Sequence, residues 1–464
     1  MPLAIVWSHV GVQAAQLLLS LSILVILHEF GHFITARWFK CRVEKFYLFF
    51  DPYFSLFKKK IGETEYGIGW LPLGGYVKIA GMVDESMDTE ELAKPPKPDE
   101  FRSKPAWQRL IIMLGGVTMN ILVAFFIYSM ILMIWGDERV ASSSMKFGVH
   151  IGDSTLMKIG LKDGDKIIGV DGQEVYDLTR FRKKLITAKM LEVERDNKKI
   201  VINLPVDFIG QLVENKNQKR TGFIEPRYPA LVRNVLDTSH AYKAGLRKND
   251  LIVGLDSVKI NFFNELVAQL QAEKKDKALL TVNRHGQDTS FMVDILTTAD
   301  SDKVIGFAPY SLAASPAELD SLGWIKYNVK KYSLLNAFPA GVKMTFEELG
   351  DYINQMKTIL NPKTGGYKGV GGFKSMGSIF STDWDWEWFW RMTAMLSVIL
   401  AFMNLLPIPA LDGGHVLFTL VEMVSGRKPN QKFLEYAQVA GMILLLALML
   451  YANGNDWFGW GKGK

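Results

Sequence analysis

The sequence predicts a multi-pass α-helical membrane protein with four transmembrane helices, a membrane-associated β-hairpin and two inserted α/β domains. Two observations support this fold class: four long runs without Asp, Glu, Lys or Arg, and one glycine-rich pattern that occurs twice between the second and third runs. A helix crosses a bilayer core with about 20 apolar residues. The four runs approach or exceed that length, at 1–27, 110–135, 392–411 and 437–455.

The first run has one other interpretation, a cleaved signal peptide. It lacks both the basic start and the small-residue cleavage site of such a peptide. We therefore expect a transmembrane helix there. The 464-residue chain is too long for one ordinary core, so several structural units are expected.

The distribution of charge predicts the membrane topology. The net charge is +6, but a nucleic-acid partner is not expected, because seven basic residues directly follow the first run and such flanks mark the cytoplasmic side of a membrane. They are Arg37, Lys40, Arg42, Lys45, Lys58, Lys59 and Lys60. By alternation, the region 136–385 then lies outside and the basic loop at 415–435 inside. The single cysteine, Cys41, excludes an internal disulfide.

Between the first two spans, the segment 61–82 alternates glycines with β-forming residues. This composition predicts a hairpin that turns near 72–75. It is apolar for a cytoplasmic loop, so we expect it to associate with the membrane. The acidic, proline-bearing stretch 84–100 predicts a flexible linker.

The outer region contains an internal repeat. The pattern at 160–172 recurs at 245–257, and a helical apolar spacing follows each copy. Two copies of one small α/β domain are therefore expected, and the pattern resembles PDZ domains. The predicted units are a catalytic membrane half at 1–135, PDZ-like domains at 141–215 and 221–310, a connecting region at 311–384, and the last two spans at 385–464.

The end of the first span carries the motif His28-Glu29-Phe30-Gly31-His32. Two histidines four positions apart lie on one helix face, where their imidazoles can bind one Zn²⁺. Glu29, on the adjoining face, can take a proton from a metal-bound water. The motif alone is common in proteins without metal, but ionisable groups within a membrane span are costly and mark function.

A catalytic zinc site needs a third protein ligand. Asp412 is the candidate, because it follows Pro407-Ile408-Pro409 at the end of the third span, on the same predicted side and depth as the two histidines. The prolines interrupt the helix and free the backbone to reach the metal. The other interpretation, a helix end at the membrane interface, explains the prolines but not the acid.

Together, these motifs resemble the site-2 protease family. The resemblance rests on HEFGH, on Asn404-Leu405-Leu406-Pro407-Ile408-Pro409-Ala410-Leu411-Asp412-Gly413-Gly414, and on the PDZ copies between spans 2 and 3. The segments 72–77 and 101–109 also fit. The family usually has Ala-Gly-Pro where this chain has Gly115-Gly116-Val117, with Asn120 retained, so the packing of the second span is expected to differ.

The resemblance implies a role for each matching residue. His28, His32 and Asp412 would hold one Zn²⁺, and Glu29 would be the catalytic base. Asn404 would bind the substrate backbone, and a strand edge at Gly67-Ile68-Gly69 would lie beside the site. His415 is expected to support the site rather than to be a fourth ligand.

The same resemblance implies an endopeptidase of the bacterial inner membrane, with its active site toward the cytoplasm and its PDZ domains in the periplasm. Its partners would be the lipid bilayer, single-span membrane proteins such as trimmed anti-sigma factors, remnant signal peptides, and peptide C-termini at the PDZ domains. Two alternatives remain, a non-catalytic membrane scaffold and a zinc transporter. Glu29 argues against the first, and the scarcity of ionisable groups in spans 2 and 4 argues against the second.

Overall fold

The structure is a computed structural model that describes residues 2–72, 74–82, 95–140, 142–175, 178–214, 223–298, 301–310, 314–428 and 430–461. Most of the predicted linker at 84–100 lies outside these residues. Among the described residues, four helices are long and apolar enough to cross a membrane. They are α1 (Pro2–Trp38), α3 (Ala106–Ile134), α12 (Trp386–Leu405) and α14 (Gln431–Phe458).

Two of the differences between the predicted spans and these helices lie at the HEFGH and proline motifs. Helix α1 continues through the HEFGH motif to Trp38, well beyond the predicted end of the first span. Helix α12 begins at Trp386 and ends at Leu405, before the predicted end of the third span. The segment with Pro407 and Pro409 is not helical, because proline supplies no backbone N–H and clashes with the preceding turn. A shorter helix, α13 (Asp412–Ser425), follows it.

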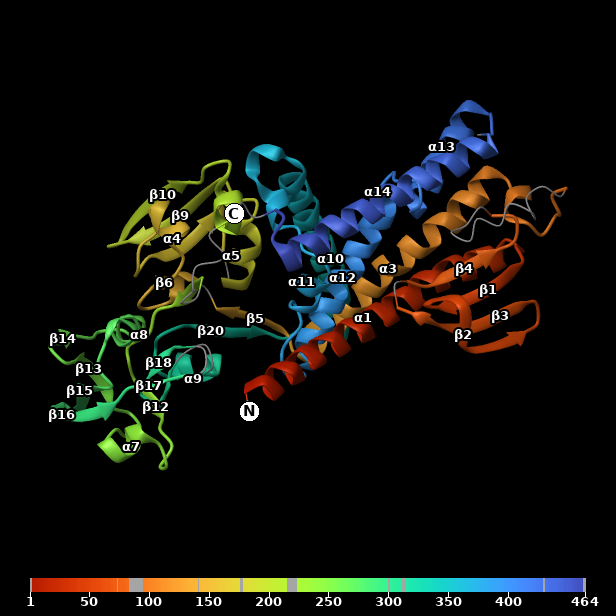
Figure 1. Cartoon of the computed structure of the whole chain (residues 1–464). Helices are drawn as coiled ribbons and strands as arrows, with labels where there is room; N and C mark the ends of the chain where they lie inside the picture. Colours follow the sequence, from red (N-terminus) through yellow and green to blue (C-terminus); the bar gives the residue numbers. More distant parts are fainter. Residues whose placement is uncertain are drawn as a thin grey trace.

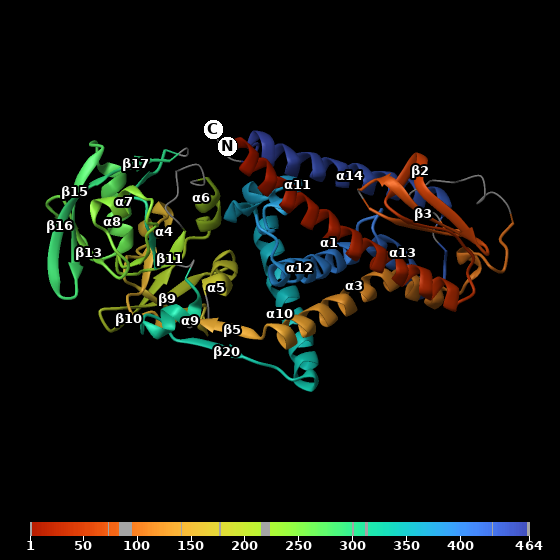
Figure 2. The same cartoon turned by 90° about the horizontal axis from the view of Figure 1, so that it is seen from below.

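Helix α3 is the centre of the bundle, since it packs against α1, α10 (Leu334–Leu360), α12 and α13. The long helix α10 crosses the others at a steep angle (Figure 2). It contacts α3 closely at Gly341, where a β-carbon would lie 2.3 Å from Ser129 Oγ. The short helix α11 (Phe373–Gly377) packs against α1 and α14.

At one end of the bundle, a four-stranded sheet lies against α1 (Figure 1). Its strands are β1 (Val43–Leu48), β2 (Phe50–Ile61), β3 (Thr64–Leu71) and β4 (Tyr76–Ile79), in the order β2-β3-β1-β4. The predicted hairpin turning near 72–75 is wrong. Strand β3 pairs with β1 in parallel and β4 pairs with β1 antiparallel, so the chain crosses β1 between them. The antiparallel hairpin is instead β2–β3, which turns at Gly62.

The two inserted units lie at the opposite end of the bundle (Figures 1 and 2). The first contains α4 (Ser154–Lys158), β7 (Lys166–Val170), β8 (Gln173–Glu174), α5 (Leu178–Leu185), β9 (Met190–Arg195), β10 (Lys198–Asn203) and α6 (Phe208–Glu214). The second contains α7 (His240–Ala244), β13 (Leu251–Leu255), β14 (Val258–Lys259), α8 (Phe263–Ala272), β15 (Lys277–Arg284), β16 (Gln287–Asp294), β17 (Leu296–Thr297) and β18 (Lys303–Val304).

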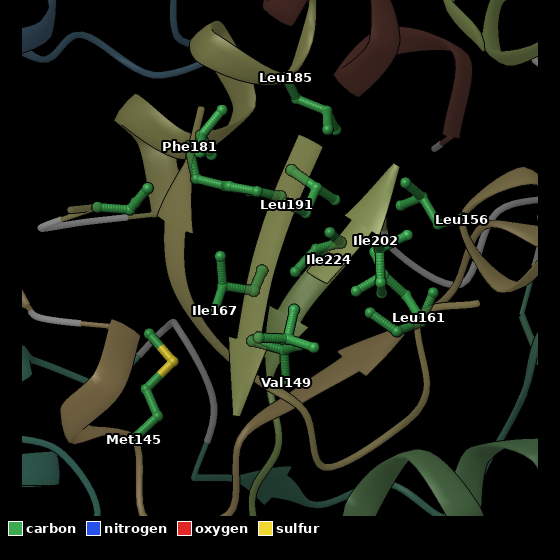
Figure 3. Close-up of a cluster of buried hydrophobic side chains, with 14 of the residues drawn as sticks. Met145, Val149, Leu156, Leu161, Ile167, Phe181, Leu185, Leu191, Ile202 and Ile224 are labelled. Atoms are coloured by element: carbon green, nitrogen blue, oxygen red, sulfur yellow. The ribbon is translucent and has the colours of Figure 1, made fainter. Parts of the chain in front are cut away.

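The repeat seen in the sequence has a structural counterpart. The sheets have equivalent orders, β10-β9-β7-β8 and β16-β15-β13-β14. In the first unit, Phe181 and Leu185 of α5 pack over Ile167 and Leu191 of the strands (Figure 3). The second unit has its own core, which includes Leu266 and Leu270 of α8. Each helix therefore covers its sheet with the apolar face that the sequence spacing predicts.

The first unit extends beyond its predicted boundary at residue 215. Strand β11 (Ile224–Pro226) pairs with β6 (Val149–Ile151) in the first unit. Strand β12 (Val232–Asn234) pairs with β19 (Ala308–Pro309), but its Val232 lies in the core of the second unit. The segment around α9 (Pro316–Ser321) packs its Leu319 and Trp324 into the first core. Finally, β20 (Tyr327–Lys330) pairs with β5 (Asp137–Val140), so the chain enters and leaves the inserted region side by side.

One ion pair occurs at the same place in both units. Asp165 in the first unit and Asp250 in the second are fully buried, and each accepts two hydrogen bonds of 2.7–2.8 Å from one arginine, Arg195 or Arg284. The same arginine donates to a carbonyl in the repeated glycine turn, at Gly160 or Gly245. Bidentate pairs of this kind fix geometry as well as adding energy. The pair therefore fastens the glycine turn to the sheet in each copy.

We expect Asp250→Ala to destabilise the second unit by about 2 kcal/mol, because it leaves Arg284 and the turn without their acceptor. Hydrogen exchange of β13 and β15 in the purified full chain should then lose protection by about 30-fold. Lys277→Ala is the matched control, since the Lys277–Asp294 pair on the same sheet is exposed and should change stability by less than about 0.5 kcal/mol. Equal effects of the two variants would contradict a stabilising role for the buried Asp250–Arg284 pair.

Candidate metal centre and active site

Helix α1 brings the two histidines of the HEFGH motif together in the interior of the bundle. Both side chains are buried, and their Nε2 atoms lie 3.3 Å apart. The rings meet edge to face at a centroid distance of 4.9 Å. This is the arrangement expected of positions i and i+4 on one helix face.

Asp412, the first residue of α13, completes a triangle with the two histidines. Its Oδ2 lies 3.2 Å from His28 Nε2 and 3.3 Å from His32 Nε2. Ligands about 2.0–2.1 Å from a tetrahedral zinc are separated from one another by about 3.3–3.4 Å. The three atoms therefore have the spacing of one face of a zinc tetrahedron, which leaves a fourth position for water or substrate.

Two further observations support a metal ion at this triangle. Asp412 Oδ2 is buried and has no hydrogen-bond partner among the described residues, and an orphaned carboxylate oxygen is costly unless a cation compensates it. His32 Nδ1 lies 2.8 Å from the carbonyl oxygen of Ile112, which can only accept. Nδ1 of His32 therefore donates to this carbonyl, and in the neutral ring the lone pair lies on Nε2, where it can bind a metal.

The close crossing of α1 and α3 positions the histidines. A β-carbon on Gly31 would lie 2.2 Å from the carbonyl oxygen of Gly115, and one on Gly116 would lie 2.4 Å from His32 Nε2 and 2.5 Å from His28 Cε1. The sequence analysis noted Gly115-Gly116 only as a departure from the family pattern. A pair of glycines within an apolar span was the available signal for a close helix crossing.

Three polar side chains surround the triangle. Asn404, near the end of α12, has its Nδ2 3.4 Å from His28 Nε2. Asn120 of α3 has its Nδ2 3.0 Å from His28 Nδ1, and the sequence analysis assigned it no role. His415 lies one turn after Asp412 and lines the same cavity, but it is not part of the triangle.

The triangle opens into a cavity of about 1330 Å³. Glu29, Asn404 and Asp412 line it together with apolar side chains of α14, among them Met442 and Leu446. Glu29 lies against the start of β4, where a β-carbon on Gly75 would be 3.3 Å from Glu29 Cγ. A carboxylate thus faces the same space as the open side of the triangle.

The predicted strand edge at Gly67-Ile68-Gly69 is wrong. These residues belong to β3, which pairs with β1 on one side and with β2 on the other, so its backbone groups are already used. They do not line the cavity. In the described part of the chain, the edge strand beside the cavity is β4, whose residues from Tyr76 to Ile79 all line it. The error follows from the hairpin prediction, because that prediction placed no strand between β3 and β4.

Comparison with known proteins gives an independent assignment. The model of the family described as Peptidase family M50 matches residues 16–448. The regulator of sigma-E protease RseP of Escherichia coli is 27% identical over 95% of this chain and 97% of its own length. The regulator of sigma E protease of Salmonella typhi is 27% identical over 98% of this chain and 99% of its own. A Campylobacter jejuni protein that carries the name of a zinc metalloprotease is 26% identical over 96% and 93%.

Among solved structures, the PDZ domain of an SdrC-like protein from Listeria monocytogenes covers 21% of this chain and 90% of its own length, with 17% identity and a TM-score of 0.16. The family match extends over nearly the whole chain and confirms the resemblance drawn from the motifs. This chain belongs to peptidase family M50, and it is a metalloprotease.

Proposed function

We propose that the protein is a zinc-dependent intramembrane endopeptidase that cleaves single-span membrane proteins within or beside the bilayer. One observation carries the proposal: the His28–His32–Asp412 triangle and Glu29 face one cavity, and helices long enough to span a membrane form its walls. A peptide bond brought into this cavity would meet a metal site and a base while shielded from bulk water.

Each residue has one chemical role in this proposal. His28, His32 and Asp412 hold a single Zn²⁺, which when bound acidifies a water molecule and polarises the scissile carbonyl. Glu29 accepts the proton of that water and later delivers it to the leaving amine. Asn404 donates its amide N–H to the carbonyl oxygen as negative charge develops there. His415 supports the site.

The substrate segment must be unwound, because a helix already uses its peptide groups in internal hydrogen bonds. Among the described residues, β4 has a neighbouring strand only on the β1 side, so an extended substrate strand can add to its other edge beside Glu29. Exposed apolar side chains at Tyr53, Phe54 and Phe57 of β2 support membrane association of the sheet.

The names of two relatives support a proposed substrate class. Both are named as regulators of sigma-E, which supports trimmed anti-sigma factors as substrates, and remnant signal peptides are a second class. In this proposal the protein lies in a bacterial inner membrane, with the zinc site toward the cytoplasm and the PDZ-like units in the periplasm. These units reject substrates with large outer domains or hold new peptide C-termini.

A scaffold that binds partners without catalysis is the alternative function. It requires neither Glu29 nor zinc, whereas the protease requires both. The two functions therefore separate in a single cleavage experiment.

We expect Glu29→Gln to abolish cleavage of a tagged single-span substrate in membranes and to leave one zinc per chain, because the amide cannot accept the proton but leaves the three ligands intact. Zinc is measured by elemental analysis of the purified protein. Glu63→Gln, the same change at an exposed carboxylate, is the control and should cleave as the wild type does. Equal cleavage by wild type and Glu29→Gln would exclude Glu29 as the base.

We expect Asn404→Ala to lower kcat on the order of 100-fold, since one donor to the developing oxyanion is lost. KM and zinc content should change little. Single-turnover cleavage in detergent measures kcat, and elemental analysis measures zinc. Loss of zinc from this variant would instead assign Asn404 to metal binding.

The paired strands β5 and β20 allow a clean removal of both outer units. Replacing residues 142–326 with a short Gly-Ser linker joins positions next to the Val140–Tyr327 pair, and it removes the α9 segment together with the core it covers. We expect this variant to cleave a substrate that keeps its large outer domain, which the full chain spares. If the variant still spares this substrate in the cleavage assay, the outer units do not exclude substrates by size.

A further inference from the structure

His28 differs from His32 in the partner of its outer nitrogen, which is Nδ1, the ring nitrogen that does not face Asp412. His32 Nδ1 faces a backbone carbonyl, whereas His28 Nδ1 faces the side-chain amide of Asn120 at 3.0 Å. Both His28 and Asn120 are buried. Among the described residues, His28 Nδ1 has no other hydrogen-bond partner. The Nδ1 atom of His28 therefore contacts one side-chain carboxamide, that of Asn120.

Metal binding at Nε2 determines which nitrogen of His28 carries the proton. A neutral imidazole has one N–H and one lone pair, so a lone pair at Nε2 requires the proton at Nδ1. An N–H at Nδ1 needs an acceptor. The carboxamide of Asn120 offers one, its Oδ1, because a half-turn about its last side-chain bond exchanges the oxygen and the nitrogen without moving the helix.

We propose that Asn120 is a positioning residue, which accepts the Nδ1 proton of His28 through Oδ1 and so holds Nε2 ready for the metal. This inference rests on the proposed zinc site. In the structure the nitrogen Nδ2 is the nearer atom, and the buried Oδ1 has no hydrogen-bond partner among the described residues. The orientation with Oδ1 toward His28 is the one that the metal-binding tautomer requires.

The position of Asn120 on α3 supports this role. Ile112, Gly116 and Asn120 are spaced four residues apart, so they form one stripe along the helix. The carbonyl of Ile112 faces His32 Nδ1, Gly116 makes room for both rings, and Asn120 faces His28 Nδ1. Since α1 and α3 run in opposite directions, the stripe meets the two histidines in reverse order. One face of α3 thus serves both outer nitrogens.

Asn120 also makes a backbone contact with α12 that does not involve its side-chain amide. Ser397 Oγ donates a 2.8 Å hydrogen bond to the backbone carbonyl of Asn120. That bond uses only the backbone carbonyl of a residue within α3, so the side-chain amide stays free for His28. It also provides a control that removes a polar contact at the same residue without touching the histidine.

The test is the zinc dissociation constant of the purified full chain, measured by competition with a chromophoric chelator. We expect Asn120→Leu to weaken zinc binding by about 10- to 100-fold, the usual effect of losing such a partner of a ligating histidine. Asn120→Asp keeps an acceptor for the Nδ1 proton and should stay within about 3-fold of the wild type. Ser397→Ala should bind zinc as the wild type does.

Each outcome decides one question. Zinc binding by Asn120→Leu equal to wild type, or equal losses in the Leu and Asp variants, would overturn the role of Asn120 and leave the proposed protease intact. Absence of zinc from the wild type would instead overturn the proposed function. If Asn120→Leu does not fold, as judged by its elution and thermal unfolding, Asn120→Ala takes its place with the same expected loss.

Discussion

The contact between Gly31 of α1 and Gly115 of α3 is the constraint on which the catalytic region depends. Each glycine occupies space that a β-carbon would share with the other helix's backbone, at 2.2 and 2.5 Å from a carbonyl oxygen. Any larger residue would separate the helices. The separation would remove the histidine rings from Ile112 and Asn120, which hold their outer nitrogens. The site is therefore built from backbone proximity as much as from its ligands.

The third ligand reaches this site through a second tight packing arrangement. Gly413 and Gly414 pack against the carbonyls of Leu406 and Ile408, with β-carbon positions only 2.2 and 2.7 Å away, so α13 turns sharply out of the proline segment. At the far end of α13, Glu422 pairs with Arg109 at the start of α3 in a largely buried contact. Asp412 is thus fixed from both ends of its helix, and α3 is the common support for all three ligands.

Features that depend on a local sequence pattern were predicted well from the sequence. Features that depend on pairing between distant segments were predicted less well. Charge-free runs located the four described helices that are long and apolar enough to cross a membrane, and the repeated glycine turn predicted two sheets whose strand orders agree. The meeting of His28 with Asp412 followed from topology and motif chemistry. The predicted strand edge at Gly67 was wrong because β1 lies between β3 and β4, and no local pattern signals a parallel pairing. Asn120 was missed because its proposed role depends on its contact with the His28 ring, and no local sequence pattern signals that contact.

The charges of the site explain why these elements converge on a cation. Glu29 and Asp412 bring two carboxylates into one cavity, and no Lys or Arg in the described part of the chain forms an ion pair with either. Burying such groups uncompensated is strongly unfavourable. Two neutral histidines supply lone pairs but no charge, so a divalent cation at the triangle would bring the formal charge of the four side chains to zero. The same cation that activates water would then also stabilise the packing of α1, α3 and α13.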